Sequence, residues 1–250
     1  MRPAGVATGP ESARAIVVSM QAPAREGGRA GGPASGFRAA GPSGVRQAST
    51  GDQPGELPPG QHLARLWPVL HYGPVPRFRP ECWDLLVFGA TESGREHRWD
   101  WPGLCDLPRC KVTADFHCVT KFTIRDACWE GIATTDLLRL APPAPDVTHV
   151  MVWAEYGYSA NLRIGDFADD LSLLATHLGG AQLSPEHGYP VRLVVPRLYG
   201  WKSVKWLRAI EYMTADRRGF WEERGYHNRA DPWREQRFSY QEAPGEGPAA

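Results

Sequence analysis

The clearest pattern of apolar and polar positions lies in residues 112–118. Apolar side chains occupy every second position there, and the apolar set is Val112, Ala114, Phe116 and Cys118. A period of two residues places alternate side chains on opposite faces of a strand, so this stretch predicts a strand with one buried face. Cys118 takes the last position on that face, where loops can bring a ligand to its thiol.

Shorter apolar runs predict the other strands. Residues 83–89, 149–155 and 193–196 are short runs of mainly apolar residues, as expected of buried strands. Residues 135–140 predict a short helix, which the Pro-rich link 142–145 ends because proline cannot continue a helix. These elements frame two further stretches with a different spacing.

Both of these stretches show helical periodicity. After Asp166, a potential N-cap, apolar residues recur at helical intervals up to Gly179-Gly180; the set is Phe167, Leu171, Leu174 and Leu178. After Ser203, a second potential N-cap, the apolar set is Trp206, Leu207, Ile210 and Met213. We therefore predict one helix from Asp166 and another from Ser203.

Composition divides the chain into three parts. Residues 1–56 are rich in Gly, Ala and Pro, with Phe37 as their one aromatic residue, and cannot bury enough apolar surface to offset their ordering entropy. We predict a disordered tail at 1–56, one folded domain at 57–240 and a second disordered tail at 241–250. The translation start is an open question, since Met20 is an alternative.

Charge and cysteine content narrow the function classes. The chain has 28 basic and 28 acidic side chains, which gives no global reason to expect a nucleic-acid or membrane-surface partner. Its five cysteines include no CxxC pair, which is more typical of a reducing compartment than of a disulfide framework. Without a signal peptide, a twin-arginine pair or a membrane-spanning run, the sequence predicts a cytoplasmic protein.

Cys118 is the main candidate for chemistry. His117 and Lys121 are close enough in sequence to support a thiolate, and a thiolate is the ligand that a soft redox metal prefers. The alternative is an inert buried cysteine. A zinc site is a second alternative, although the spacing of its candidate ligands matches no common zinc pattern; they are His97, Cys105, Cys110, His117 and Cys118.

A second cluster predicts a phosphate pocket. Lys202, Ser203 and Lys205 would gather at the start of the predicted second helix, where free N–H groups favour an anion. His187 and Arg192 flank the adjoining strand. A solvated basic face is the alternative.

Four motifs then occur in a characteristic order. They are His71-Tyr72-Gly73-Pro74-Val75-Pro76 before Trp83-Asp84-Leu85, then Asp115-Phe116-His117-Cys118-Val119-Thr120, then His187 to Pro196, then Trp201 to Leu207. Together they resemble the sulfite oxidase family of molybdopterin oxidoreductases, and above all its single-domain bacterial members, which are related to the methionine sulfoxide reductase catalytic subunit. The resemblance covers about residues 57–240. It implies an α+β fold with mixed curved sheets and short helices around a buried pterin.

The resemblance also implies roles for particular residues. Cys118 matches the molybdenum ligand, and it is the one residue to which a catalytic role is assigned. His187 and Arg192 match residues that hold the pterin, and Ser203, Val204 and Lys205 match the segment around its phosphate. His71 and Tyr72 fall in the loop that covers the cofactor. The implied cofactor is molybdenum-molybdopterin, which would carry out the oxygen-atom or electron transfer.

The chain also departs from the family pattern. It lacks a haem motif, so a separate protein or small carrier must exchange electrons, and Asp84 lies near where a substrate-binding arginine is expected. The predicted function is oxygen-atom or electron transfer on a small substrate, such as a sulfoxide, sulfite or a similar oxo-compound. The alternatives are a non-catalytic anion- or partner-binding module with this fold, and a zinc enzyme.

Overall fold

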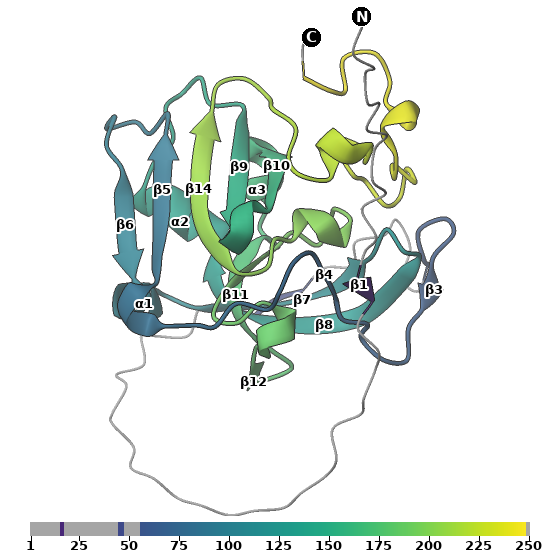
Figure 1. The fold of residues 1–250 in the computed structure, drawn as a ribbon, viewed down its shortest axis with the longest axis horizontal. Coiled ribbons are helices and arrows are strands. Elements are labelled where there is room, and N and C mark those ends of the chain that lie inside the picture. The colour runs from purple at the N-terminus through teal and green to yellow at the C-terminus, as the bar shows by residue number, and fades with distance from the viewer. Residues whose placement is uncertain (1–15, 18–44, 48–55, 249–250) are drawn as a thin grey trace, which may run out of the picture.

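The computed structural model describes residues 16–17, 45–47 and 56–248, within which the chain forms two main β-sheets. The first sheet has five strands. In spatial order they are β10 (Ser159–Arg163), β9 (His149–Ala154), β14 (Leu207–Met213), β5 (Asp84–Gly89) and β6 (His97–Asp100). The sheet is mixed because β14 pairs parallel with β5 and antiparallel with β9. In Figure 1, β5, β9 and β14 stand upright above the second sheet.

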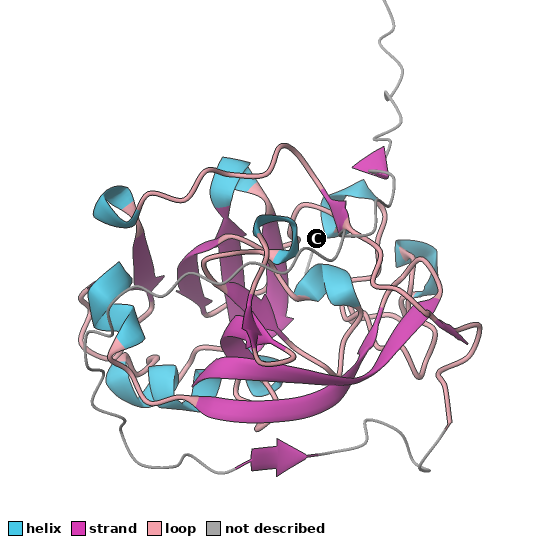
Figure 2. Cartoon of the chain, turned by 90° about the horizontal axis from the view of Figure 1, so that it is seen from below, coloured by secondary structure: helices cyan, strands magenta, loops and turns pink. Residues whose placement is uncertain are grey.

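The second sheet has seven strands. Its main path is β12 (Ala181–Gln182), β11 (Leu173–Leu178), β8 (Phe122–Ala133), β7 (Cys110–His117) and β2 (Val45–Gln47), with β13 (Arg192–Val194) on β11 and β3 (His62–Leu63) on β8. A separate two-stranded sheet pairs β1 (Ile16–Val17) with β4 (Leu70–His71). Seen from below, the long strands are visibly curved (Figure 2).

Helices are short throughout the described part of the chain. The α-helices are α1 (Trp101–Cys105), α2 (Thr134–Leu140) and α3 (Ile164–Phe167). Six single-turn 3₁₀ segments span Pro80–Cys82, Glu155–Gly157, Pro185–His187, Gly200–Lys202, Glu222–Arg224 and Ser239–Gln241. Mixed curved sheets with few short helices confirm the predicted α+β fold.

Two glycines allow the close packing that shapes the interior. A Cβ on Gly131 of β8 would lie 2.7 Å from the Cα of Ala175 on β11, so the two strands need a glycine there. A Cβ on Gly200 would lie 2.5 Å from the ring of Phe116, at the end of β7. The second contact brings the segment after Gly200 against the strand that leads to Cys118.

The predicted strands and the short helix are confirmed, while both longer helices are wrong. β7, β5, β9, β13 and α2 lie where the sequence predicts them. The helix predicted from Asp166 is instead the four-residue α3 followed by β11, and the helix predicted from Ser203 is β14. Both stretches are central strands with a partner on each side, and this pairing prevails over their helical spacing.

The predicted domain limits stay predictions. Most of the segment 1–56 lies outside the described residues, so its predicted disorder and the alternative start at Met20 are not tested. In the segment 241–250, the Glu242 carboxylate accepts hydrogen bonds from Arg218 at 2.9 and 2.6 Å and from the Asn228 N–H at 2.8 Å. Glu242 thus contacts the domain.

Candidate functional site

A cavity of about 190 Å³ opens where the end of β7 meets residues 200–206. Its wall is mainly aromatic, with rings from Trp67, Trp201, Trp206, Trp221 and Tyr226 among others. Six of the eight predicted site residues line it: His71, Tyr72, Cys118, Arg192, Ser203 and Lys205. The fold thus gathers residues from four separate motifs around one cavity.

Cys118 stands at the start of the turn between β7 and β8. Its N–H donates to the Phe122 carbonyl at 2.8 Å, and the Lys121 N–H donates to the Cys118 carbonyl at 3.0 Å. Lys121 has a φ of 75°, the left-handed conformation that closes such three-residue hairpin loops. The turn leaves the Cys118 side chain only 8% exposed.

The surroundings of the Cys118 thiol affect its pKa in opposite directions. Burial raises the pKa of the Cys118 thiol, whereas a hydrogen bond from Thr120 and the charges of Arg237 and Lys205 act to lower this pKa. The Thr120 hydroxyl lies 3.1 Å from Cys118 Sγ, to which it donates. His117 instead contacts Thr123, and burial lowers its pKa to about 4, so this imidazole is neutral at pH 7 and supplies no charge to the thiol.

Arg192 is a buried cation of the cavity wall. Its guanidinium donates to the carbonyls of His187 at 3.1 Å and Ser203 at 2.8 Å. Burial lowers the pKa of Arg192 to about 10, so it stays charged at pH 7. Within the described parts of the chain, no carboxylate lies within ion-pair distance of it. The charge is held by peptide carbonyls and by the rings of Phe116 and Trp129, whose centres lie 5.5 and 5.3 Å from the guanidinium carbon.

Lys205 has a similar environment. Its ammonium donates to the Leu70 carbonyl at 2.8 Å and the Glu186 carbonyl at 2.6 Å. Burial, with the nearby charge of Arg192, lowers the pKa of Lys205 to about 7. No described carboxylate forms an ion pair with this lysine either. Near pH 7 Lys205 is therefore only partly charged; an anion such as a phosphate would favour its charged form and would also interact with Arg192 in the same wall.

The remaining lining residues support this wall. The His71 ring packs edge-on against Trp206 at 5.3 Å, and the Tyr72 ring lies 4.3 Å from that of Phe220. Ser203 caps no helix; its hydroxyl accepts the Val195 N–H at 2.9 Å. The predicted helix start at Ser203 is therefore absent, and the basic side chains stand on a folded loop instead.

Two predicted site residues stand behind the lining. The His187 ring packs against Trp67 at 5.8 Å, and burial lowers its pKa to about 4. Val204 lies in the core, where its carbonyl accepts the Leu193 N–H at 2.8 Å. Both flank the wall that carries Arg192 and Lys205.

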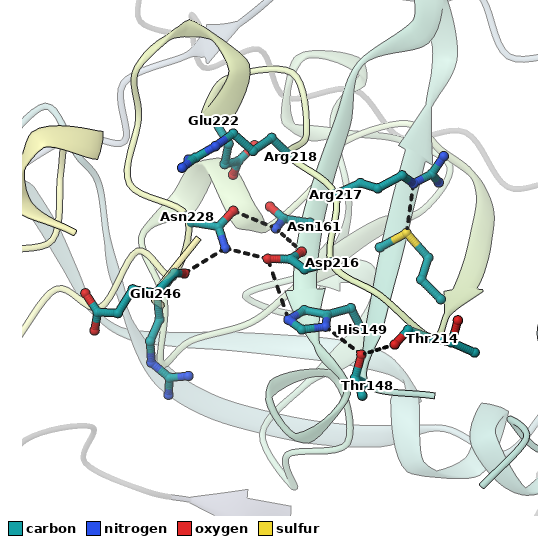
Figure 3. A network of polar contacts seen from close by, with 12 residues as sticks. Thr148, His149, Asn161, Thr214, Asp216, Arg217, Arg218, Glu222, Asn228 and Glu246 are labelled. Atoms are coloured by element: carbon teal, nitrogen blue, oxygen red, sulfur yellow. Dashed lines mark hydrogen bonds and ion pairs between the residues drawn. The ribbon is translucent and has the colours of Figure 1, made fainter. Parts of the chain in front are cut away.

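Lys202 does not line the cavity. Its ammonium lies 2.6 Å from the Glu222 carboxylate, and both side chains are fully buried. Oxygens of Asn161 and Asn228 also accept from it, at 2.7–2.8 Å. Figure 3 shows these two asparagines joined onward to Asp216. Lys202 therefore belongs to a closed polar network, and the predicted anion role does not apply to it.

Metal-binding groups are sparse. Among the residues that the structure describes, no three His, Cys, Asp or Glu side chains are grouped as a metal site, so the proposed zinc ligands are not brought together. Cys118 is the one thiol among the described lining residues. One soft ligand beside two cations fits a metal that arrives with its own ligands and an anionic group.

A second cavity of about 320 Å³ adjoins the first, and Trp206 lines both. Its Arg208 pairs with Asp84 at 2.7 Å and with Glu155 at 2.6 Å. Asp84 lies near the position where the family resemblance leads one to expect a substrate-binding arginine. Here it is part of an ion-pair cluster outside the Cys118 cavity.

Sequence reasoning missed three residues around the Cys118 loop. They are Thr120, Gln61 and Arg237; the last two donate to the carbonyls of Cys118 and Val119. Thr120 could have been found, since it is two residues from Cys118 in the same motif. Gln61 and Arg237 are distant in sequence and carry no local signal.

Comparisons with known proteins agree with the geometry. The family model described as "Oxidoreductase molybdopterin binding domain" matches residues 72–221. The uncharacterized oxidoreductase YuiH of Bacillus subtilis is 40% identical over 190 residues, which cover 76% of this chain and 95% of that protein.

More distant relatives have established names. The methionine-sulfoxide reductase catalytic subunit MsrP of Campylobacter jejuni is 28% identical, over 62% of this chain and 59% of its own. Human mitochondrial sulfite oxidase is 28% identical over 61% of this chain, but the match spans only 33% of that enzyme.

A solved structure shares the fold. The sulfane dehydrogenase SoxCD of Paracoccus pantotrophus superposes with a TM-score of 0.55 at 21% identity, covering 66% of this chain and 48% of that one.

In the described ranges, none of the helices has the length and apolar character to cross a membrane.

Proposed function

The chain belongs to the family of oxidoreductases with a molybdopterin-binding domain, and from this premise we propose a molybdenum-molybdopterin enzyme that acts on a small oxo-compound. One observation carries the proposal: Cys118 shares a cavity with two basic side chains, the buried Arg192 and the half-buried Lys205, that have no described carboxylate partner. A thiolate suits the metal, and the cations suit the phosphate of the pterin.

The chain's residues then take separate roles. Cys118 would bind the metal, Arg192, Ser203 and Lys205 would hold the phosphate end, and His187 and Val204 would support that wall from behind. His71 and Tyr72 would cover the cofactor on the side of Trp206 and Phe220. When bound, the cofactor supplies the transfer of an oxygen atom or of electrons; the protein binds it, orients it and excludes water.

The lining favours a neutral substrate. Arg192 and Lys205 are the Lys and Arg side chains among the described lining residues, and both are assigned to the phosphate. Asp84 pairs with Arg98 and Arg208 outside this cavity, so no further Lys or Arg among the described lining residues faces a sulfite dianion there. A sulfoxide or similar neutral oxo-compound, held among aromatic rings, fits better than sulfite.

We further propose a cytoplasmic location and a separate electron-transfer partner. The cysteine pattern supports the first, and the lack of a haem motif in the sequence supports the second. The reduction potential of that partner, relative to the potential of the substrate, would set the direction of the reaction.

Elemental analysis tests the proposal. Protein from a molybdopterin-competent host should contain molybdenum and pterin in equal amounts with the chain. Zinc alone would support the zinc enzyme instead, and an empty protein that binds phosphate would support the binding module.

A matched pair of variants tests the metal ligand. Cys118→Ser should keep pterin, because the phosphate contacts remain, but lose turnover and change the metal's paramagnetic resonance signal. Cys128→Ser, at a half-buried cysteine outside the lining, is the control and should do neither. An unchanged metal–sulfur shell in Cys118→Ser would refute the assignment.

A further inference from the structure

The loop after Cys118 is held from outside by two distant segments. Gln61 directly precedes β3, and Arg237 lies in the C-terminal segment after β14. Both fall outside residues 72–221, the part that the family model matches. Figure 1 shows the yellow C-terminal segment and β3 on the same side of the molecule.

Gln61 binds the carbonyl of Cys118 itself. Its side-chain Nε2 donates to that oxygen at 3.0 Å, and its Oε1 accepts from the Thr123 hydroxyl at 3.4 Å. The backbone continues this contact, since the His62 N–H donates to the Lys121 carbonyl at 3.0 Å. One side of the hairpin turn is thus covered by the segment that starts at Gln61.

Arg237 binds the next carbonyl. Its Nη1 donates to the Val119 oxygen at 2.5 Å, and its Nη2 lies 3.3 Å from the Pro59 oxygen. The guanidinium also lies 4.9 Å from the ring centre of Tyr199, and the residue is only 4% exposed. Arg237 therefore links the C-terminal segment, the Cys118 loop and the start of the domain.

The two contacts act on consecutive peptide groups, which fixes the direction of the intervening backbone. The Cys118 carbonyl carbon is bonded to the Cα that carries Cβ and Sγ, so rotation of this peptide group would move the thiol relative to Arg192 and Lys205. The contact to the Val119 carbonyl holds the next peptide group and so limits that rotation. Without Arg237 the Val119 carbonyl would lose the donor described here, whereas without Gln61 the Cys118 carbonyl would keep one bond, from the Lys121 N–H. A ligand residue needs such support from its neighbours to keep its geometry.

We infer that Gln61 and Arg237 form a clamp that positions the Cys118 thiol in the cavity. Both are positioning residues, since neither lines the cavity. The working site therefore extends beyond the family-matched region at both ends. The consequence for the metal rests on the proposed function, whereas the geometry of the loop can be tested in metal-free protein.

The rate at which Cys118 is alkylated in the metal-free protein at fixed pH, followed by peptide mass spectrometry, reports how firmly the loop is held. Gln61→Leu and Arg237→Met remove the donors and retain most of the side-chain volume. Gln61→Leu should speed the labelling of Cys118 on the order of tenfold, the factor expected for one lost hydrogen bond. Arg237→Met should speed it by less at fixed pH, because it also removes a charge that lowers the thiol pKa. Arg237→Lys retains one donor and should restore slow labelling.

Internal controls separate loosening of the loop from unfolding. Arg234→Met alters an arginine of the same segment whose side chain is 64% exposed, and it should label as the wild type does. Cys110, which is 4% exposed, should stay unlabelled throughout. Unchanged labelling of Cys118 in both clamp variants would overturn the inference, as would parallel labelling of Cys110. If Arg237→Met does not fold, Gln61→Leu decides the test.

The loaded protein gives a second readout. X-ray absorption of Arg237→Met should show an altered metal–sulfur distance, and Arg234→Met should not. An unaltered distance alongside fast labelling would overturn the link to the metal. Absence of molybdenum from every variant, wild type included, would contradict the proposed function while leaving the labelling result intact.

Discussion

Two lysines of one short segment differ in their surroundings: Lys202 is fully buried and Lys205 is half-buried. Lys202 has a carboxylate at 2.6 Å and three further oxygen contacts from asparagines. Lys205 has two peptide carbonyls, and burial lowers its pKa to about 7. A cation with its partners complete stabilises the fold, and one whose partners are incomplete is available to a ligand.

The buried ion pair of Lys202 and Glu222 also supports the cavity wall. Trp201 lines the cavity, and its indole N–H donates to the Glu222 carboxylate at 2.8 Å. Tyr158, another lining residue, donates to the Trp201 carbonyl at 2.7 Å. Lys202 thus holds the wall on which the aromatic rings stand, while Lys205 faces the cavity.

The largest expected effect is on Lys202. Lys202→Met leaves the Glu222 carboxylate buried without its cation, which should lower the free energy of unfolding by about 3–5 kcal/mol. Lys205→Met should lower it by about 1 kcal/mol or less, because only peptide carbonyls lose a donor. Urea unfolding measures both.

A double variant tests the cause of that difference. Lys202→Met combined with Glu222→Leu removes both charges and should recover most of the lost stability. An equal loss of unfolding free energy in Lys202→Met and Lys205→Met would contradict the difference proposed between the two lysines.

The next largest effect concerns Arg192, which has no described carboxylate partner. Arg192→Met should weaken cofactor binding by about 1.5–3 kcal/mol, or one to two decades in affinity, through loss of a charged hydrogen bond. Pterin content under limiting cofactor measures this. Arg197→Met, at an arginine paired with Asp169 and 55% exposed, is the control. Wild-type pterin content in Arg192→Met would remove Arg192 from the site.

A pH titration sharpens the comparison further. Burial holds the pKa of Lys205 at about 7 in the folded chain, against an ordinary 10.5. Between these values the unfolded chain binds the proton and the folded chain does not, so the free energy of unfolding should rise with pH across that window. Subtracting the curve of metal-free Lys205→Met from that of metal-free wild type isolates this contribution. Parallel curves would show that Lys205 titrates normally.

The smallest expected effect is at the N-terminal end. Removal of residues 1–56 should change the midpoint of thermal unfolding and the pterin content little, because their composition supports little apolar burial and their two described strands, β1 and β2, are short and lie at sheet edges. Calorimetry and pterin assay of the shortened chain provide the check. A fall in either quantity would mean that this segment contributes to the domain.

How far the sequence determined these conclusions differs by element. The alternation at 112–118 was sufficient for β7, because one of its faces is buried and the other is not. Residues 173–178 of β11 are apolar on both faces at their start, so no period-two signal exists there. Their spacing then fits a helix equally well, and only the pairing with β8 and β13 decides.

The site divides in the same way. Six predicted residues meet in the cavity because each lies in a local motif. Lys202 was grouped with Lys205 since their neighbourhood in sequence is the same, and only the fold reveals Glu222 as its partner. Gln61 and Arg237 reach the Cys118 loop across 57 and 118 residues, which no local pattern encodes.

Because Arg237 lies near the end of the chain, its contact to the Cys118 loop can form only late in synthesis. A ribosome makes this arginine 118 residues after Val119, the residue whose carbonyl it binds. During translation, the segments that carry Cys118, Arg192 and Lys205 are complete while the loop beside Cys118 still lacks its second donor. The nascent domain therefore passes through a stage with a loosened cavity, and closure waits for the last segment. Truncation within that segment would leave every cavity-lining residue in place and still prevent closure.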